Sequence, residues 1–456
     1  MRKIGSPSST LVDTAKSVGV NKRLKSPLSV QIEVTGECTS ECLHCYNFWR
    51  EKGERSLQRI QSGILNEDNT VTIFKKLGEV EVLHVTITGG EPLSNYLVTL
   101  KSIELARSMD MGVGLNSNLV LLTKEKAGSL KKAGLSHVLT SILGPTAEIH
   151  DSITQRQGSF RKLMDGINAA HDAGIKVSTN MVVSQRNQEH VIKTAQVVAG
   201  LGIKNFMAAK AGCPGNCSDF SHLALSRPQL TKFLNDLCWV HKNLGLQVNT
   251  LEPIPLCGLY GVIRPELFIS RKCNAGVTTA TISYDGSMRP CSHLDMSYGN
   301  LLTEDFSTIW ERMNPWSQLA HVPIECLKCD MLNMCGSGCR MEAKTTTGKI
   351  DGLDSATSFA HVAEMTEAIR ISMKPADRIL MKNFKTLKFR LRREDFGGVF
   401  ISDNAQVFLD NKGFAVLSQL GSEVTYDLAT MIIDWNGLDP EKFVSGLAHR
   451  RMVSSV

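Results

Sequence analysis

The sequence is most informative at Cys38-Thr39-Ser40-Glu41-Cys42-Leu43-His44-Cys45-Tyr46, directly after the apolar run Leu28–Val34. Three thiols, separated by three and then two residues, can reach one metal centre from a single loop. Iron–sulfur cubanes normally take four thiolates, so three local ligands leave one iron open for a non-protein group. Zinc is the alternative, but a structural zinc site needs a fourth ligand, and His44 is awkwardly placed between two close thiols. The loop therefore favours an iron–sulfur cluster.

The composition narrows the class of protein. The chain has 456 residues, a net charge of +6, 42% hydrophobic residues and 13 cysteines. Its length predicts about three domains, and the charge is too thinly spread to indicate nucleic acid. No run approaches the roughly 18 apolar residues of a membrane span, and the N-terminus lacks the apolar core of a signal peptide. We therefore expect a cytoplasmic, reducing location, where clustered thiols bind metals or react.

Apolar runs alternate with amphipathic stretches from Leu28 to about residue 210. Alternation of this kind predicts a parallel sheet with crossover helices. Six units are fewer than the eight of a closed barrel, so we expect a partial barrel. The expected strands are Leu28–Val34, Val82–Thr88, Met111–Asn116, His137–Ile142, Lys176–Val183 and Lys204–Ala209, and the expected helices are Val71–Leu77, Leu97–Met109, Thr123–Ala133, Phe160–Ala173 and His190–Leu201.

The rest of the chain divides by composition. Past about Pro214 it is rich in Pro, Gly and Cys, which indicates a loop-rich region organised by metal, whereas residues 387–456 contain no Cys. That last segment predicts three short strands, Lys388–Arg392, Gly398–Ser402 and Ala405–Leu409, followed by helices. We expect a lead-in over 1–27, an α/β core over 28–215, a Cys-rich region over 216–345, a linker over 346–384 and a small α+β domain over 385–456.

The Cys38–Tyr46 loop resembles that of the radical S-adenosylmethionine (SAM) superfamily, whose fold is a partial (β/α)6 barrel. The resemblance implies that Cys38, Cys42 and Cys45 hold a [4Fe-4S] cluster whose open iron binds the amino and carboxylate groups of SAM. Gly89-Gly90-Glu91-Pro92, after the second strand, resembles the superfamily's GGEP motif. Its glycines would let the backbone approach the ligand closely, and Glu91 would accept hydrogen bonds from the methionyl ammonium.

Weaker matches follow in the superfamily's order, and two of them depart from its pattern. Leu119 replaces the glycine of the usual Thr-Asn-Gly element, and Leu143 replaces the acidic residue that usually follows Ser141. The stretch from His150-Asp151 to Gly158-Ser159-Phe160 also resembles the superfamily. The residues that the resemblance places at SAM are Tyr46, Gly89, Gly90, Glu91, Pro92, Asn116, Asn118, Ser141, Arg156 and Asn180.

The later cysteines, over about residues 253–342, resemble the SPASM extension of radical SAM peptide-modifying enzymes. That extension carries one or two auxiliary [4Fe-4S] clusters; a zinc knuckle is the alternative. The resemblance implies a first cluster on Cys273, Cys291 and Cys339 with Cys257 as the fourth ligand, and a second on Cys326, Cys329 and Cys335. A further Cys normally follows downstream, but Asp354-Ser355-Ala356-Thr357 stands there. The second cluster would then use Asp351, Asp354 or His361, keep an open iron, or be absent.

The C-terminal segment, from Phe389-Arg390-Leu391-Arg392-Arg393 to Gly413-Phe414, resembles the PqqD-like RiPP recognition element. This is a small winged-helix-like domain that binds the leaders of ribosomally made, modified peptides by strand addition. An ordinary winged-helix or dimerisation domain is the alternative. Nucleic acid is disfavoured because Glu394 and Asp395 follow the arginines directly.

Together the resemblances imply a radical SAM oxidoreductase that modifies a precursor peptide. A thioether or carbon–carbon crosslink is the first expectation, and epimerisation is the alternative. Cys213 and Cys217 are the candidate catalytic thiols, as hydrogen-atom donors, but a structural role is favoured for them and for Cys238. The expected partners are the peptide leader and a flavodoxin- or ferredoxin-like electron donor. The rivals are an enzyme like the anaerobic sulfatase maturases and a non-catalytic iron–sulfur or zinc scaffold.

Overall fold

The structure, a computed structural model, divides into two units that are described separately: residues 26–370, and residues 1–25 together with 371–456. Among the residues it describes, no helix is both long enough and apolar enough to cross a membrane. The described residues are 23–47, 63–212, 220, 222–372, 383–386, 389–402, 406–420, 423–425, 433, 443, 444, 447 and 453–455.

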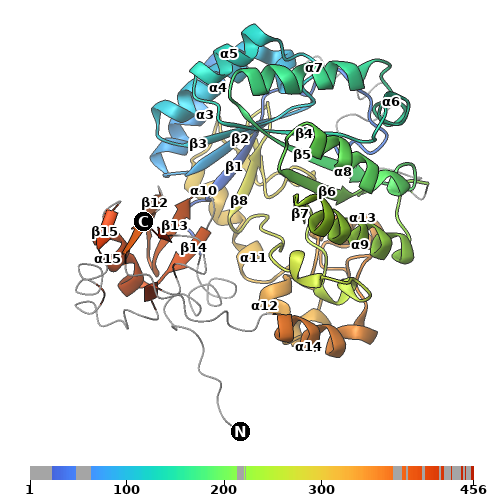
Figure 1. Cartoon of the computed structure of the whole chain (residues 1–456). Coiled ribbons are helices and arrows are strands. Elements are labelled where there is room, and N and C mark those ends of the chain that lie inside the picture. The colour runs from blue at the N-terminus through green and yellow to red at the C-terminus, as the bar shows by residue number, and fades with distance from the viewer. Residues whose placement is uncertain are drawn as a thin grey trace. The chain divides into compact units, whose positions relative to one another are not determined.

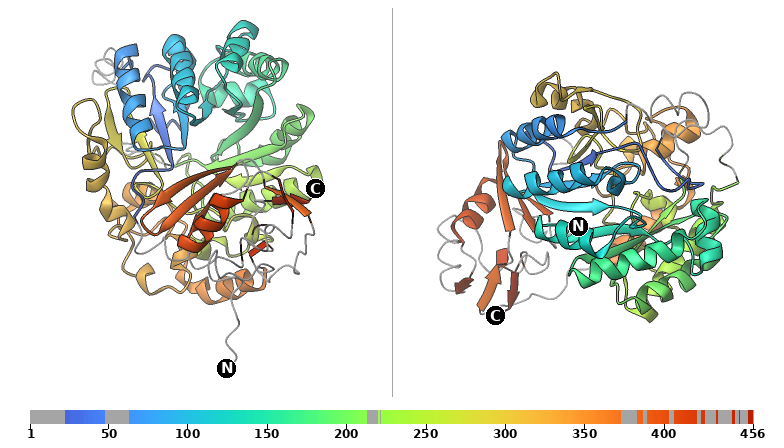
Figure 2. Two further views of the ribbon diagram at one scale, coloured as in Figure 1. Left: turned by 90° about the vertical axis from the view of Figure 1, so that its left-hand side faces the viewer. Right: turned by 90° about the horizontal axis from the view of Figure 1, so that it is seen from above.

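The larger unit is built on one ten-stranded sheet, in the order β10-β9-β8-β1-β2-β3-β4-β5-β6-β7. The strands from β8 to β7 in that order run parallel, and at one edge β9 pairs antiparallel with both β8 and β10. The helices between the strands lie on their outer side (Figure 1), and Figure 2 shows this layering from two further directions. The strands are β1 Ser29–Glu33, β2 His84–Thr88, β3 Gly112–Asn116, β4 His137–Ser141, β5 Lys176–Val183, β6 Asn205–Lys210, β7 Gln247–Thr250, β8 Thr279–Ile282, β9 Ser287–Arg289 and β10 Gly299–Asn300.

The partial barrel predicted from the sequence is confirmed, with each expected strand and helix between residues 28 and 210 present. Local signals explain several helix ends. The Asn66 side chain accepts a hydrogen bond from the Asn69 N–H and begins the first helix, which has acidic residues in its first turn. The helices that alternate with the strands are α3 Glu67–Glu79, α4 Tyr96–Ser108, α5 Lys124–Lys132, α6 Ala147–Thr154, α7 Ser159–Asp172, α8 Val191–Gly200 and α9 Arg227–Leu244.

The alternation of strand and helix continues beyond the point where the sequence pattern is lost. α9 begins at a capping box between Ser226 and Gln229 and ends at Gly245, whose φ is +65°. The short strand β7 then pairs parallel with β6, while β8 pairs parallel with β1 at the opposite side of the barrel. Four-residue strands are too short to show a periodic pattern, so the sequence did not reveal these additions.

Residues 251–370 are mostly turns and short helices, as the Pro-, Gly- and Cys-rich composition predicts. A buried ion pair ties this region to the barrel: Arg289 of β9 donates to the Glu33 carboxylate at the end of β1 at 2.5 Å, and both side chains are 2% exposed. The helical elements are η4 Leu256–Leu259, η5 Pro265–Leu267, α10 Phe306–Arg312, α11 Asn314–Ser317, η6 Cys326–Lys328, α12 Leu332–Cys335, α13 Arg340–Thr347, η7 Phe359–His361 and α14 Val362–Ser372.

The smaller unit contains the predicted run of three antiparallel strands, in the order β12-β13-β14, followed by a helix. The helix α15 begins where the Asp410 carboxylate accepts a hydrogen bond from the Gly413 N–H at 2.8 Å. Within β12, Arg392 donates to Glu394 at 2.6 Å, and both are buried. The elements are β12 Phe389–Glu394, β13 Gly397–Ser402, β14 Gln406–Leu409 and α15 Asn411–Gln419, with β11 Asn383–Thr386, β15 Glu423–Thr425 and β16 Val453–Ser455 in a second sheet.

Candidate active site and iron–sulfur sites

The loop that carries Cys38, Cys42 and Cys45 begins at the carboxyl end of β1, and its three thiols are partly exposed. Backbone hydrogen bonds fix the loop in place. The N–H groups of Glu41 and Leu43 donate to carbonyls in the last turn of α6, at 2.9 and 3.0 Å. The loop therefore has a defined path before any cluster is considered.

The glycines of the GGEP segment make room for the backbone that leads into the cysteine loop. A Cβ at Gly89 or Gly90 would collide with the carbonyl oxygens of Thr35 and Glu37, respectively. This close approach allows two backbone bonds, from Gly90 N–H to Thr35 O at 2.7 Å and from Glu91 N–H to Glu37 O at 2.6 Å. The segment thus braces the cysteine loop.

Glu91 is fully buried and joins the GGEP segment to the end of β3. Its carboxylate accepts hydrogen bonds from Leu93 N–H at 2.9 Å, Ser117 Oγ at 2.7 Å and Asn118 N–H at 2.8 Å. Burial raises the pKa of Glu91, and these hydrogen bonds oppose that shift. The three internal bonds give Glu91 a positioning role, and its expected contact with the SAM ammonium stays a prediction.

Asn118 reaches from the end of β3 to the cysteine loop. Its Nδ2 lies 2.9 Å from Thr39 Oγ1 and 3.9 Å from Cys38 Sγ. The next residue, Leu119, has φ +60°, so it adopts the left-handed conformation that the superfamily's glycine would adopt without strain. The element keeps its shape although its glycine is replaced.

The other residues expected at SAM lie at the carboxyl ends of neighbouring strands or beside them. Ser141 and Asn180 are opposite each other in the β4–β5 register. Asn180 is buried, and its Oδ1 has no hydrogen-bond partner among the described residues, so it can accept from a ligand. Their contacts with SAM stay predictions, as do those of Asn116 at the end of β3, Pro92 at the start of the 3-10 helix η2 Pro92–Asn95, and the exposed Arg156.

The segment from His150 to Phe160 has a structural explanation. The Asp151 carboxylate accepts hydrogen bonds from Gly158 N–H, Ser159 Oγ and Phe160 N–H at 2.6 to 2.8 Å, and so caps α7. Burial lowers the pKa of His150 to about 4, and its Nδ1 accepts from Leu143 N–H at 3.1 Å. The same cause lowers the pKa of His44, in the cysteine loop, to about 4.

Tyr46 connects the first cysteine loop with the later cysteines. Its ring contacts the His293 ring, with centroids 4.1 Å apart, and His293 N–H donates to Cys291 Sγ at 3.4 Å. Burial raises the pKa of Tyr46 and lowers that of His293 to about 4. The contact between Tyr46 and His293 therefore links the cysteine loop to the turn at Cys291.

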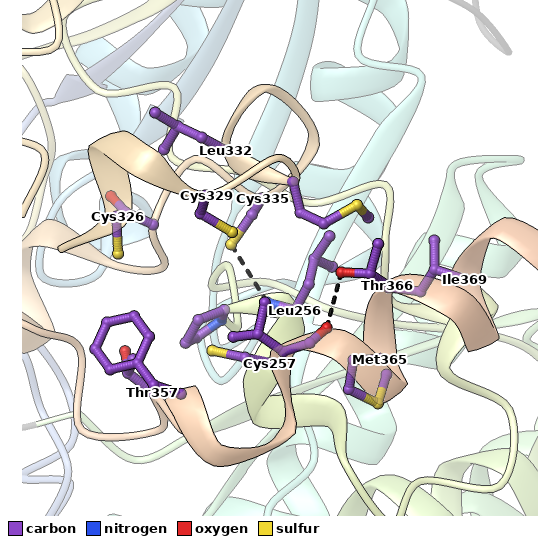
Figure 3. A pocket seen from close by; sticks show the side chains of 15 residues that line it. Leu256, Cys257, Cys326, Cys329, Leu332, Cys335, Thr357, Met365, Thr366 and Ile369 are labelled. Atoms are coloured by element: carbon purple, nitrogen blue, oxygen red, sulfur yellow. Dashed lines mark hydrogen bonds between the residues drawn. The ribbon is translucent and has the colours of Figure 1, made fainter.

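The later cysteines form two groups, and Cys257 is not where the SPASM resemblance placed it. It lines one cavity with Cys326, Cys329 and Cys335, and Figure 3 shows the four side chains around that cavity. The other group consists of Cys273, Cys291 and Cys339, which interact electrostatically with one another. The structure thus groups Cys257 with Cys326, Cys329 and Cys335, whereas the resemblance expects it with Cys273, Cys291 and Cys339.

The non-cysteine ligands considered for the second cluster have other contacts. The Asp354 carboxylate accepts from Cys339 N–H at 2.8 Å and Ala356 N–H at 2.9 Å, and so supports the loop. His361 lies 3.1 Å from Glu364 and stacks on Tyr260 with centroids 3.6 Å apart, while Asp351 is exposed.

Several charged residues near the site belong to no sequence motif, and the sequence did not predict them. Glu33 and Arg289 are two of them, and Arg289 also donates to the carbonyls of Ser292 and Leu294, in the turn that Cys291 begins. A second pair joins Lys210, at the end of β6, to Glu342 of α13 at 2.7 Å, with both side chains largely buried. The sequence signal that could have revealed Glu33 and Lys210 is a charged residue at the end of an apolar strand.

The candidate thiols Cys213 and Cys217 lie outside the described residues, and Cys238 is buried in the core.

The donor sets fit iron–sulfur chemistry. One loop presents three thiols, and two further groups of cysteines lie among turns, where thiolates bind clusters. The unpartnered Asn180 Oδ1 and the glycine cradle at the strand ends fit a polar ligand beside the first loop.

Comparisons with known proteins match two families over this part of the chain. Residues 32–198 match the radical SAM superfamily, and residues 273–337 match SPASM, an iron–sulfur cluster-binding domain. The AdoMet-dependent heme synthase of Methanosarcina barkeri is 26% identical over 71% of this chain and 94% of its own length. The PqqA peptide cyclase of Gluconobacter oxydans is 23% identical over 78% of this chain and 98% of its own length.

Among solved structures, native anSMEcpe with bound AdoMet and Cp18Cys peptide has a similar fold, with a TM-score of 0.58 and 20% identity, covering 76% of this chain and 98% of that one. AdoMet is SAM. This chain therefore carries a radical SAM domain followed by a SPASM domain, and it is an enzyme that uses SAM, a [4Fe-4S] cluster and auxiliary iron–sulfur clusters.

Proposed function

We propose that this enzyme modifies a ribosomally made precursor peptide, most simply by forming a thioether or carbon–carbon crosslink. The likeness to PqqA peptide cyclases, which extends over nearly their whole length, carries the proposal. When the cluster on Cys38, Cys42 and Cys45 and SAM are bound, they supply one-electron reductive cleavage to methionine and a 5′-deoxyadenosyl radical. The electron would come from a flavodoxin- or ferredoxin-like protein.

The chain's own residues provide rigidity and position. Glu91 and Asn118 hold the GGEP segment, the end of β3 and the cysteine loop in one hydrogen-bonded group. The unpartnered Asn180 Oδ1 offers an acceptor for SAM. Because these groups are held before SAM binds, little reorganisation is needed to place the radical against one bond of the peptide.

The smaller unit supports the peptide proposal. Its three-stranded antiparallel sheet has β12 and β14 at its edges, as far as the chain is described. An extended leader can pair with such an edge, where main-chain hydrogen bonds give affinity and pockets read alternate side chains. We propose that residues 385–456 bind the leader and so raise the local concentration of the peptide segment to be modified.

The test uses the full chain, reconstituted anaerobically with iron, sulfide, SAM and dithionite, and a short precursor peptide encoded next to its gene. We expect 5′-deoxyadenosine and a peptide mass lower by two hydrogens, measured by mass spectrometry. One hydrogen atom would go to the 5′-deoxyadenosyl radical, and the other would leave as a proton while its electron passes to an auxiliary cluster. A chain truncated before residue 385 should bind the labelled leader at least about tenfold more weakly, a loss of about 1.4 kcal/mol, while still cleaving SAM. Equal leader affinity after truncation would refute the role of the smaller unit.

Haem synthesis is the second candidate, because AdoMet-dependent heme synthases match this chain over most of their length. The same reaction is therefore run with a tetrapyrrole carboxylic acid in place of the peptide. Substrate-dependent loss of carboxyl groups from the tetrapyrrole, with the peptide unchanged, would replace the peptide proposal.

A further inference from the structure

The cavity at Cys326, Cys329 and Cys335 contains a fourth thiol, from a segment about seventy residues earlier in the chain. Cys257 belongs to η4, directly after Leu256, whose N–H donates to Cys335 Sγ at 3.3 Å. The two cysteine-bearing segments are thus joined by a hydrogen bond that ends on one of the sulfurs. Figure 3 shows this contact beside the four cysteine side chains.

Cys257 contacts the segment in which the SPASM pattern leads one to expect a downstream cysteine. Ser358 N–H donates to Cys257 Sγ at 3.4 Å. A Cβ at Gly258 would lie 2.6 Å from the Ala356 carbonyl oxygen, so only glycine allows the two loops to pack this closely. Arg227 of α9 donates to the carbonyls of both Ala356 and Cys257, at 3.1 and 3.4 Å, and so clamps the loops together.

The chemistry of the cavity suits a cluster with four thiolates. Backbone N–H groups point at Cys257 and Cys335, and hydrogen bonds to cluster sulfurs are a known means of tuning reduction potential. The rest of the lining includes Met331, Val362 and Met365. An apolar shell of this kind limits access of water to the metal site.

We propose that Cys257 is the fourth thiolate of an auxiliary [4Fe-4S] cluster on Cys326, Cys329 and Cys335. Cys257, which lies earlier in the sequence, thereby takes the role of the cysteine that is absent at Ala356–Thr357. This cluster then has a complete set of thiolates, and the group formed by Cys273, Cys291 and Cys339 has three. The proposal concerns the auxiliary clusters alone and does not depend on a peptide substrate.

The test is spectroscopic and needs no substrate. Full-length wild type and the variants Cys257→Ala, Cys329→Ala and Cys291→Ala are reconstituted anaerobically, and iron content, Mössbauer and EPR spectra are recorded. We expect Cys257→Ala and Cys329→Ala to alter or remove the signal of one and the same cluster, with up to about four irons fewer per chain. The double variant should lose no more than either single variant. Cys291→Ala should affect a different signal.

Cys238→Ala is the matched control, because Cys238 is a buried cysteine in the core of α9, and its iron content should equal that of wild type. Where Cys257→Ala yields little folded protein, Cys257→Ser is measured instead, since an alkoxide-type ligand would shift the same signal. If the Cys257 variants alter the signal affected by Cys291→Ala, or alter none, the proposal is wrong.

Discussion

The loop at Cys38 and the cavity at Cys257 are built in opposite ways. The first takes all three thiols from eight consecutive residues, whereas the second brings together thiols from η4 and from the segment between Cys326 and Cys335. The first is fixed by neighbouring backbone, through Thr35, Glu37 and the last turn of α6. The second is fixed by a side chain, Arg227, that clamps two separate loops.

This difference explains what each site can do. A local loop with three ligands leaves a coordination position for SAM, and it must be rigid without help from the metal. A site assembled from distant segments can close completely around a cluster and so becomes part of the packing of residues 251–370. The first arrangement suits chemistry, and the second suits electron transfer and structural support.

The largest expected effect is on SAM cleavage, and it distinguishes the loop at Cys38 from the cavity at Cys257. Cys42→Ala removes one of the three thiols that are expected to hold the cluster, so 5′-deoxyadenosine formation should become undetectable. Cys329→Ala should leave SAM cleavage measurable, because the cluster at Cys38 keeps its ligands. The measurement is 5′-deoxyadenosine by liquid chromatography under dithionite. A complete loss in Cys329→Ala, with the first cluster still present by EPR, would show that the two sites are not independent.

The buried ion pair that joins the two regions should give the next largest effect. Burial raises the pKa of Glu33 while Arg289 lowers it, so Arg289→Met leaves a buried carboxylate without its counter-charge. We expect the free energy of unfolding of the larger unit to fall by about 3–5 kcal/mol, measured by thermal or urea unfolding of the chain. The Glu33→Gln, Arg289→Met double variant should recover part of this loss.

The control for that prediction is Arg312→Met, since the Arg312–Glu304 pair is exposed, with side chains 46% and 31% accessible. Because water screens this exposed pair, its loss should change stability far less than the loss of Arg289 does. Equal losses for the buried and exposed pairs would contradict the importance assigned to the link between β1 and β9.

The smallest expected effect concerns the brace of the cysteine loop. Gly90→Ala places a Cβ against the Glu37 carbonyl oxygen and should cost about 1–3 kcal/mol through displacement of the loop. It should also lower cluster occupancy at Cys38, measured as iron per chain. Gly128→Ala in α5, where a Cβ meets nothing within 4 Å, should instead stabilise by about 0.5–1 kcal/mol. Full cluster occupancy in Gly90→Ala would contradict the role of the GGEP segment in bracing the cysteine loop.

The sequence predicted most of the barrel because each strand from β1 to β6 has five or more residues and lies in an apolar run. Lys176–Val183 was predicted with the bounds that the structure has. β7 was missed because four residues cannot show a period. The ligand spacing around Cys38 predicted a site because its residues are neighbours in sequence. The sequence did not predict that Cys257 lines one cavity with Cys326, Cys329 and Cys335, because tertiary packing sets its neighbours and spacing does not encode that packing.

The pairing of β1 with β8 has a consequence for the order of events during synthesis. β1 is made early, but its second neighbour in the sheet lies about 250 residues later, and the cation that pairs with Glu33 is residue 289. Until that part of the chain has left the ribosome, the strand that carries the cysteine loop has an open edge and an unneutralised acid. Cluster loading at Cys38 is therefore expected to follow translation of the SPASM region, which makes the nascent chain a poor acceptor of iron and the finished chain a good one.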